Sequence, residues 1–503
     1  MLKHSPEIQA WLETTYTSTK MTAKDLFPEN FYSPFCSLHD QIFEWLDRKT
    51  FVDKNGVVRP SNKKVCAAPR GIGKTTIVRT VAAKAILWRD VNFITYTSNS
   101  ADVAGMQTEN LKADLRSPLI KDLFGDIKIA NYDGDDTTFG KKAWIAFGST
   151  MILPRGFEQQ HRGLNWRGHR PQILILDDLE DKDLIQNEVN RKKLKERFFS
   201  DIEKCINRFQ KDYTFIYIDT LKHEDSLLAL LLESSDWDSL TLSICDENYN
   251  TLAPEYMSNE DIAHEVEMHR EKGVLDEFYR EYMNIPISTE DAVFMSKYFR
   301  YYDEAEDKLD QNPRIENVVI VDPAKTVKLH SAESAIIGIG FDRSDNRIYI
   351  RDLLAQKLYP DQLYDRTFEM VQRLKARVVA VEVTGLNEFI TYPIKTEITK
   401  RNLNVEFIEL DARGKKEERI AHLAPFYRKG MIYHNKQVTG PLEAQLLSFP
   451  RSKRLDCMDA EAYFIELLEK AERYFYNDDD EEPADDMSYP DDLEVAIGGW
   501  RVL

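Results

Sequence analysis

One stretch decides how the first half of the chain folds: Ala68-Pro-Arg-Gly-Ile-Gly-Lys-Thr75. It follows a short apolar run at 64–67 and leads into a helix-like run at 75–87. A glycine-containing turn between a strand and a helix directs backbone N–H groups at an anion, and the helix dipole adds partial positive charge. Lys74 can then reach the β- and γ-phosphates of a nucleotide, and the Thr75 hydroxyl can ligate Mg²⁺. The stretch predicts a P-loop that binds and hydrolyses ATP, although Ala68 occupies the position where such a loop usually has its first glycine.

The composition is that of a globular protein with several domains. A chain of 503 residues is long enough to bury more than one core. No apolar run reaches the roughly 18–20 residues of a membrane span, and the N-terminus lacks an apolar signal core, so we expect a cytoplasmic protein with no membrane partner. The cysteines form no CxxC pair and are expected to be reduced, packed thiols. They are Cys36, Cys66, Cys205, Cys245 and Cys457.

Charge is spread unevenly along the chain. The formal net charge is −19, but ten acidic residues and one basic residue fall in the segment from 477 to the C-terminus. Basic clusters remain at 155–170, 191–197, 413–419 and 451–454. A solvated helix face explains any one of these clusters as well as DNA binding does, so charge alone does not identify a partner.

Apolar strands alternate with helical stretches after the P-loop, and this pattern is typical of a parallel sheet covered on both faces. The expected strands are 92–97, 142–147, 172–176 and 213–218. We therefore predict an α/β P-loop ATPase domain of the RecA type. The predicted divisions are a helical segment at 1–60 that packs on the ATPase domain, the ATPase domain at 61–235, and an ATPase subdomain or linker at 236–290.

A second α/β pattern follows the best linker candidate, 285–291. Its expected strands are 318–322, 335–341, 347–353 and 378–383, with a helix at 361–375 and a final helix after position 459. Three successive strands followed by αβαβα is the order of a ribonuclease-H-like sheet. We predict such a domain at 291–475 and a disordered acidic tail at 476–503.

Acidic residues end the strand at 172–176. In P-loop enzymes the first of them, here Asp177, holds magnesium through water, and a following acid polarises the attacking water. That second role is open between Asp178 and Glu180. Thr220 ends the next strand, where it either contacts the γ-phosphate or caps a helix.

Arginines near these strands are candidates for an arginine finger, which offers a planar cation to the transition state. They are Arg70, Arg155 and Arg162. Gln41, on the helix expected at 38–46, is a candidate for reading the adenine edge. The full set predicted to bind ATP and its magnesium is Gln41, Arg70, Gly71, Gly73, Lys74, Thr75, Thr76 and Asp177.

Carboxylates also gather in the second pattern. Asp322 ends a strand, Glu382 lies within another strand, and Asp456 and Asp459 flank the start of the last helix. A carboxylate in an apolar strand is costly to desolvate unless it is paired or binds a metal. Converging on one sheet edge, these acids would hold two divalent ions about 4 Å apart, the arrangement that hydrolyses phosphodiesters.

The motifs together resemble the large subunit of tailed-phage terminases, over about residues 35–475. The matching segments, in family order, are Pro69–Thr76, Gln160–Gly163 with Arg170-Pro171, Asp177-Asp178, Asp219–Asp225, Pro254-Glu255, Phe278–Asn284, Asp322-Pro323, Glu382, Lys415–Pro425 and Asp456–Ala460. Asp219 stands where the family usually has glycine. The family's last motif often has a doubled Asp where this chain has Leu455-Asp456, so Asp456 and Asp459 both stay open as metal ligands.

The resemblance implies an ATP-driven motor that cuts concatemeric viral DNA and packages it. Implied partners are double-stranded DNA, the portal protein of the procapsid and the small terminase subunit, in the cytoplasm of an infected bacterium. It also implies a ring of subunits in which Arg162, or else Arg155, completes the neighbour's ATP site. Lys415, Lys416 and Arg419 would contact DNA phosphates beside nuclease metals, Mg²⁺ or Mn²⁺. The acidic tail would contact the portal or the small subunit, or only aid solubility.

Two other functions fit part of the pattern. One is a P-loop DNA translocase or helicase whose ribonuclease-H-like domain is inactive, which predicts ATP hydrolysis without DNA cleavage. The other is a nucleotide-dependent scaffold without turnover, since no conventional Glu follows Asp177.

Overall fold

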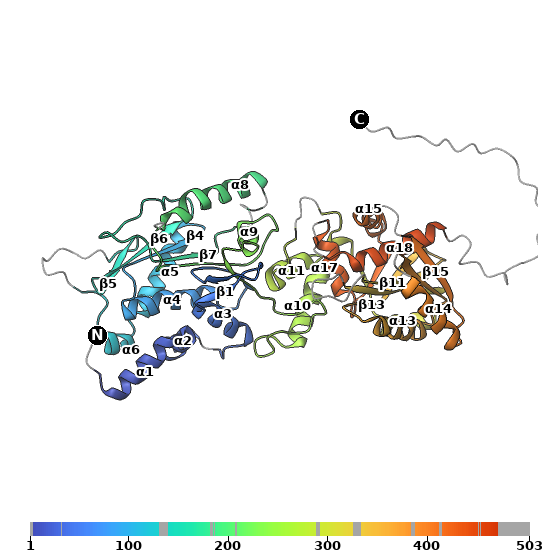
Figure 1. Cartoon of the computed structure of the whole chain (residues 1–503), viewed down its shortest axis with the longest axis horizontal. Helices are drawn as coiled ribbons and strands as arrows, with labels where there is room; N and C mark the ends of the chain where they lie inside the picture. The colour runs from blue at the N-terminus through green and yellow to red at the C-terminus, as the bar shows by residue number, and fades with distance from the viewer. Residues whose placement is uncertain are drawn as a thin grey trace, which may run out of the picture.

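Figure 1 shows an elongated molecule in which the two halves of the chain form two lobes, with α10, α11 and α17 between them. The computed structural model describes residues 4–31, 33–129, 139–181, 185, 187–206, 209–287, 292–324, 333–383, 388–411, 415–450, 452 and 454–470. The predicted acidic tail and residues 288–291 of the predicted linker lie outside these ranges.

Helices α1 (Pro6–Thr17), α2 (Thr19–Leu26) and α3 (Ser37–Asp47) precede the first sheet. Thr19 ties α2 to the end of α3, because its backbone N–H and its hydroxyl donate to the Asp47 carboxylate at 2.8 and 2.6 Å. Buried Leu26 and Ile42 join these helices to the main core. A short hairpin of β1 (Thr50–Val52) and β2 (Val58–Pro60) follows.

The first sheet has the strand order β5-β6-β4-β7-β8-β3-β9. Its strands are β3 (Lys63–Ala67), β4 (Phe93–Ser98), β5 (Trp144–Ala146), β6 (Thr150–Gly156), β7 (Ile173–Asp177), β8 (Thr214–Asp219) and β9 (Asp238–Thr241). All neighbours are parallel except β5 and β6. β8 lies between β3 and β7, as in RecA-type P-loop ATPases, which confirms the predicted fold of this half.

Helices cover both faces of this sheet. Alternate residues of β3 and β8 enter different cores, since Cys66 and Ile218 pack in one and Val65 and Tyr217 in the other. The first core includes α4 (Lys74–Trp88), α5 (Ala101–Asp114) and α6 (Pro118–Phe124). The second includes α8 (Glu188–Arg197) and α9 (Leu227–Leu232).

Strand β6 was not predicted from the sequence. It contains Pro154, and proline removes a ladder hydrogen bond, so it argues against a strand inside a sheet. β6 pairs with β5 only at Thr150, Met151 and Ile152. Pro154 lies beyond that pairing, where β6 has β4 on one side only, so its missing N–H leaves no ladder bond broken on the other side.

The second sheet has the order β10-β16-β13-β12-β11-β14-β15. Its strands are β10 (Arg300–Tyr302), β11 (Ile315–Asp322), β12 (Ser334–Asp342), β13 (Arg347–Gln356), β14 (Val378–Val383), β15 (Glu406–Asp411) and β16 (Ile432–Asn435). β12 runs antiparallel to both of its neighbours. The segment β13-β12-β11-β14-β15 is therefore the 3-2-1-4-5 order of ribonuclease H, as predicted.

Helices α13 (Pro360–Leu374) and α14 (Glu388–Lys400) pack on one face of the second sheet, and α18 (Asp456–Lys470) packs on the other. The shorter helices of this half are α12 (Glu304–Asp307), α15 (Lys416–Ala421), α16 (Ala424–Arg428) and α17 (Gly440–Ser448).

A buried polar network joins the two lobes. It links α10 (Asn259–Glu271) and α11 (Leu275–Met283) to α17. The Tyr279 hydroxyl donates to the Gly440 carbonyl at 3.0 Å, and Arg270 Nη2 donates to Glu443 Oε2 at 3.3 Å. Glu443 is fully buried and also binds His434 Nδ1 at 3.0 Å. A side chain on Gly440 would collide with the Glu247 carbonyl, so the two lobes meet in close contact.

All five cysteines are buried and free, as expected from the sequence. Among the described residues, none of the helices has both the length and the apolar character needed to cross a membrane.

Candidate nucleotide and metal sites

The P-loop connects β3 to the first residue of α4, Lys74. Gly71 and Gly73 have φ angles of 87° and 74°, a left-handed conformation that glycine adopts without strain. Gly73 is the N-cap of α4. The loop therefore wraps the N-terminus of a 15-residue helix, where backbone N–H groups and the dipole favour an anion. Thr75 and Thr76 lie half-buried in the first turn.

Lys74 is buried and directed at the tip of the neighbouring strand. Its Nζ donates to Thr220 Oγ1 and, at 3.3 Å, to the Ala68 carbonyl. Thr220 Oγ1 in turn donates to the same carbonyl at 3.2 Å. The residue that follows β8 thus contacts the lysine that would bind nucleotide phosphates.

Asp177 ends β7 and is held from two sides. Thr75 Oγ1 donates to its Oδ1 at 3.1 Å, and the Tyr96 hydroxyl donates to its Oδ2 at 2.7 Å. Burial raises the pKa of Asp177, and the hydrogen bonds from Tyr96 and Thr75 oppose that rise. The pairing of a P-loop threonine with a strand-end aspartate is an arrangement of hard oxygen ligands suited to Mg²⁺.

The two candidates for the base have different environments. Asp178 is exposed at the sheet edge with a φ of 47°, and loss of solvation around its carboxyl group, together with Asp219, raises its pKa to about 7. Glu180 is buried, and its carboxylate accepts from the backbone N–H groups of Leu227 and Leu228 at 2.6 and 3.3 Å. Glu180 therefore caps the N-terminus of α9, and Asp178 has the more accessible carboxyl group.

The predicted arginines differ in exposure. Arg155 is half-buried near the carboxyl end of β6, where burial lowers its pKa and its Nε has no hydrogen-bond partner among the described residues. Arg162 is exposed, and its backbone N–H donates to Asp201 Oδ1 at 2.5 Å. Arg70 is exposed beside Glu281, 3.7 Å away. Gln41 is also exposed on α3.

Three other residues contact the P-loop and were not identified from the sequence. His39 Nε2 lies 2.9 Å from the Ile72 carbonyl, and the Glu281 carbonyl accepts from Arg70 N–H at 2.8 Å. The Tyr256 hydroxyl lies over Gly71, 3.0 Å from where a Cβ would stand. His39 is two residues from Gln41 on the same helix, and no residue pattern distinguishes which of them faces the loop.

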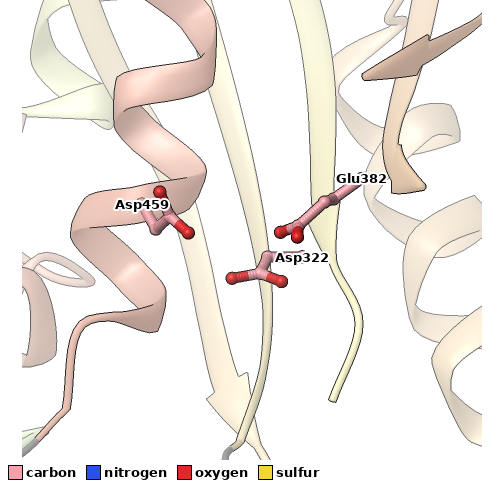
Figure 2. A group of neighbouring side chains, drawn as sticks. All are labelled: Asp322, Glu382 and Asp459. Atoms are coloured by element: carbon pink, nitrogen blue, oxygen red, sulfur yellow. The ribbon is translucent and has the colours of Figure 1, made fainter. Parts of the chain in front are cut away.

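Figure 2 shows the acidic cluster of the second half, in which Asp322, Glu382 and Asp459 point toward one another from β11, β14 and α18. One carboxylate oxygen from each residue lies within 4.8 Å of the others. All three residues are buried. Burial and a hydrogen bond to Glu382 raise the pKa of Asp322 well above its usual value. An all-carboxylate set of this kind fits hard divalent cations such as Mg²⁺ or Mn²⁺.

Cations from α15 border this cluster. Lys416 Nζ lies 2.9 Å from Asp459 Oδ2 and 3.2 Å from Asp322 Oδ2. Burial opposes its charge, but the two carboxylates outweigh burial and raise the pKa of Lys416. Arg419 is buried, and its Nε and Nη2 lie 2.7 and 2.6 Å from Asp459 Oδ1. Lys416 and Arg419 therefore fix Asp459, whereas Lys415 at the start of α15 is exposed.

Asp456 lies at the border of the cluster. It precedes Asp459 by one helical turn of α18, and Lys416 Nζ is 3.8 Å from its Oδ1. Burial raises the pKa of Asp456. The three-residue cluster includes Asp459 and leaves Asp456 outside.

Solved structures of phage large terminases match the chain, whereas no protein-family model and no curated protein matches it. The large terminase of a thermophilic bacteriophage has 11% identity and a TM-score of 0.30, over 87% of this chain and 99% of that one. The ATPase domain of the Thermus phage P74-26 enzyme has 12% identity and a TM-score of 0.29, over 49% and 97%. The Mn-bound nuclease domain of the bacteriophage SPP1 enzyme has 16% identity and a TM-score of 0.24, over 34% and 96%.

Replacing the two candidate bases should separate catalysis from capping. Asp178→Asn should lower kcat for ATP hydrolysis by roughly 10²–10⁴-fold, the usual contribution of a general base. Glu180→Gln should lower the unfolding midpoint, because the cap of α9 is weakened, and should change kcat by less than about 10-fold. Steady-state ATPase assays and thermal unfolding measure both effects. The assignment is wrong if Glu180→Gln loses the greater part of the turnover.

Replacing the clustered carboxylates should weaken metal binding. Asp322→Asn, Glu382→Gln and Asp459→Asn should each raise the Kd for Mn²⁺ by at least about 10-fold, measured by titration calorimetry without nucleotide. Asp456→Asn is the matched control, because it removes one carboxylate from the same helix, and its effect should be smaller. A larger loss in Asp456→Asn than in Asp459→Asn would reverse the assignment of the ligand.

Proposed function

We propose that this chain is an ATP-driven DNA-packaging motor of the viral terminase type, which hydrolyses ATP in its first half and cleaves DNA in its second. The observation that carries the proposal is the presence, in one chain, of a P-loop threonine bonded to a strand-end aspartate and a buried Asp322–Glu382–Asp459 cluster on a sheet of ribonuclease H order. A phosphate-binding loop alone fits many enzymes. The second, separate carboxylate site is of the kind that hydrolyses phosphodiesters, and this narrows the choice to enzymes that also cut nucleic acid.

In the ATPase half, backbone N–H groups of the P-loop and Lys74 bind the phosphates. Thr75 and Asp177 would hold Mg²⁺, which neutralises charge on the phosphates when bound. Asp178 orients and deprotonates the attacking water, since its carboxyl group is accessible at the sheet edge. Thr220 contacts Lys74 and is placed to respond to loss of the γ-phosphate. Tyr256 and His39 lie beside the loop and help to enclose the nucleotide.

In the nuclease half, Asp322, Glu382 and Asp459 would hold Mg²⁺ or Mn²⁺, which activates water and stabilises the leaving oxygen when bound. Arg419 and Lys416 keep the Asp459 carboxylate in place. Lys415, exposed at the start of α15, is the cation best placed to contact a DNA phosphate without reading sequence.

The proposed partners are double-stranded DNA, the portal of a viral procapsid and a small terminase subunit, in the cytoplasm of an infected bacterium. Packaging would use a ring of subunits. Arg162 is exposed and would complete a neighbour's ATP site, with Arg155 as the second choice. These partners follow from the motif resemblance of the sequence together with the two sites.

Cleavage of supercoiled plasmid by the purified chain in Mn²⁺ tests the proposal, beside Asp322→Asn and Lys74→Ala. We expect the wild type to convert plasmid to nicked and linear forms, Asp322→Asn to lose at least about 10²-fold in rate, and Lys74→Ala to retain cleavage. In a parallel assay, ATP hydrolysis should be lost in Lys74→Ala and retained in Asp322→Asn. This crossed pattern is expected only when two independent hydrolytic sites share one chain.

The other outcomes overturn the proposal. ATP hydrolysis without cleavage by the wild type, in either Mg²⁺ or Mn²⁺, indicates a translocase with an inactive second domain. Loss of both activities in Lys74→Ala indicates a single site. Nucleotide binding without turnover indicates a scaffold.

A further inference from the structure

A buried ion pair lies behind the ATP site. Asp219, the last residue of β8, has no exposed surface, and its Oδ1 lies 2.6 Å from Lys222 Nζ. The Lys222 side chain is itself only 14% exposed. Such a pair adds little stability compared with apolar residues of the same volume, because both charges must be desolvated. Its contacts therefore need an explanation beyond folding stability.

The pair contacts the backbone of all three ATP-site segments. The Asp219 carboxylate accepts from Thr220 N–H at 2.7 Å and from Glu180 N–H at 3.1 Å, and the Asp219 carbonyl accepts from Ala68 N–H at 3.0 Å. Lys222 Nζ also donates to the Glu180 carbonyl at 2.6 Å. The carboxylate and the ammonium thus link the turn after Asp177 to the tip of β8, and the Asp219 backbone carbonyl joins the start of the P-loop to the same strand.

The electrostatic environment keeps both members charged. Burial opposes ionisation of Asp219, but Lys222 and Lys74 outweigh burial and hold its pKa below the usual value. Burial likewise opposes the charge of Lys222, and Asp219 outweighs it and raises the pKa of Lys222. The charge of Asp219 in turn raises the pKa of the neighbouring Asp178. Asp219 is therefore an anionic acceptor that fixes its neighbours.

The turn that the pair holds is strained. Asp178 has a φ of 47°, a left-handed conformation that a non-glycine residue keeps only when its surroundings enforce it. Its backbone N–H donates to the Ile218 carbonyl at 3.3 Å, one residue before Asp219. Two residues after Asp178, the Asp219 carboxylate accepts from Glu180 N–H, and Lys222 Nζ donates to the Glu180 carbonyl. The strained residue is thus held on both sides by the end of β8 and the residues that follow it.

We propose that Asp219 and Lys222 are a positioning pair for ATP hydrolysis, which holds Asp178 and Thr220 in the geometry that the γ-phosphate requires. The inference rests on the proposed ATPase function and adds to it two residues that act through Asp178 and Thr220. The P-loop backbone and Lys74, which bind the phosphates, keep most of their contacts when the pair is removed. Loss of the pair should therefore reduce the rate of hydrolysis far more than the affinity for ATP.

The test is a double-mutant cycle of Asp219→Asn, Lys222→Met and the double variant in the full chain, with kcat, KM and the Kd for ATP measured. Each single variant should lower kcat by about 10²-fold, the cost of a small misplacement of reacting groups, with Kd within about 3-fold of the wild type. The two changes should be non-additive, so that the double variant loses no more than either single one.

Lys195→Met is the matched control. Lys195 contacts Asp225 on the same face of the sheet without reaching Glu180 or the P-loop, and its replacement should leave kcat unchanged. Thermal unfolding of each variant checks that the ATPase half is folded. Unchanged kcat in both single variants, or equal losses in kcat and in affinity, overturns the positioning role. A wild type that binds ATP without hydrolysing it overturns the proposed function itself.

Discussion

A carboxylate that ends a buried, apolar strand is the constraint on which both sites depend. The apolar strand brings the carboxylate out of water, and hydrogen-bond donors or cations must then compensate its charge. The Asp177 carboxylate accepts hydrogen bonds from the hydroxyl groups of Thr75 and Tyr96. The Asp219 carboxylate pairs with Lys222 and accepts from two backbone N–H groups. Asp322 faces Glu382, Asp459 and Lys416. The same strand-end position thus builds the candidate nucleotide site in one sheet and the candidate metal site in the other.

A short series of polar contacts connects the two halves, beside the apolar core that they share. Tyr279 on α11 contacts α17, and the carbonyl of Glu281 on the same helix accepts from Arg70 in the P-loop. Gln445 on α17 binds the backbone N–H of Cys457 at 3.0 Å, at the start of the helix that carries Asp459. Contacts between neighbouring helices therefore run from the P-loop through α11 and α17 to α18, the helix that carries Asp459.

The fold was largely predictable because the signals were local. Continuous apolar runs predicted β7, β8, β11, β12 and β14 to within a few residues, and their order predicted both domain types. Strand β6 was missed because Pro154 and Arg155 interrupt its apolar pattern, and its proline is tolerated only through the limited pairing with β5. The domain boundaries stay predictions, and the acidic tail lies outside the described residues.

The sites were predictable only in part. Residue type and spacing singled out Lys74, Asp177, Asp322 and Glu382 as candidates, and the structure brings Asp322 and Glu382 together. Asp456 and Asp459 are one helical turn apart, so spacing alone puts both on one face. Tertiary packing orients Asp459 into the cluster and turns Glu180 into a helix cap. The contacts of His39 and Tyr256 with the P-loop join segments that are distant from it along the chain, and no local pattern predicts them.

The central claim is that one chain has two separate sites, each built on a strand-end carboxylate. Anomalous diffraction at the manganese edge, from crystals grown with Mn²⁺ and a non-hydrolysable ATP analogue, tests it most directly. The account predicts one set of peaks between Thr75, Asp177 and the phosphates, and another among Asp322, Glu382 and Asp459. Manganese at the nucleotide alone, with none within coordination distance of Asp322, would contradict it.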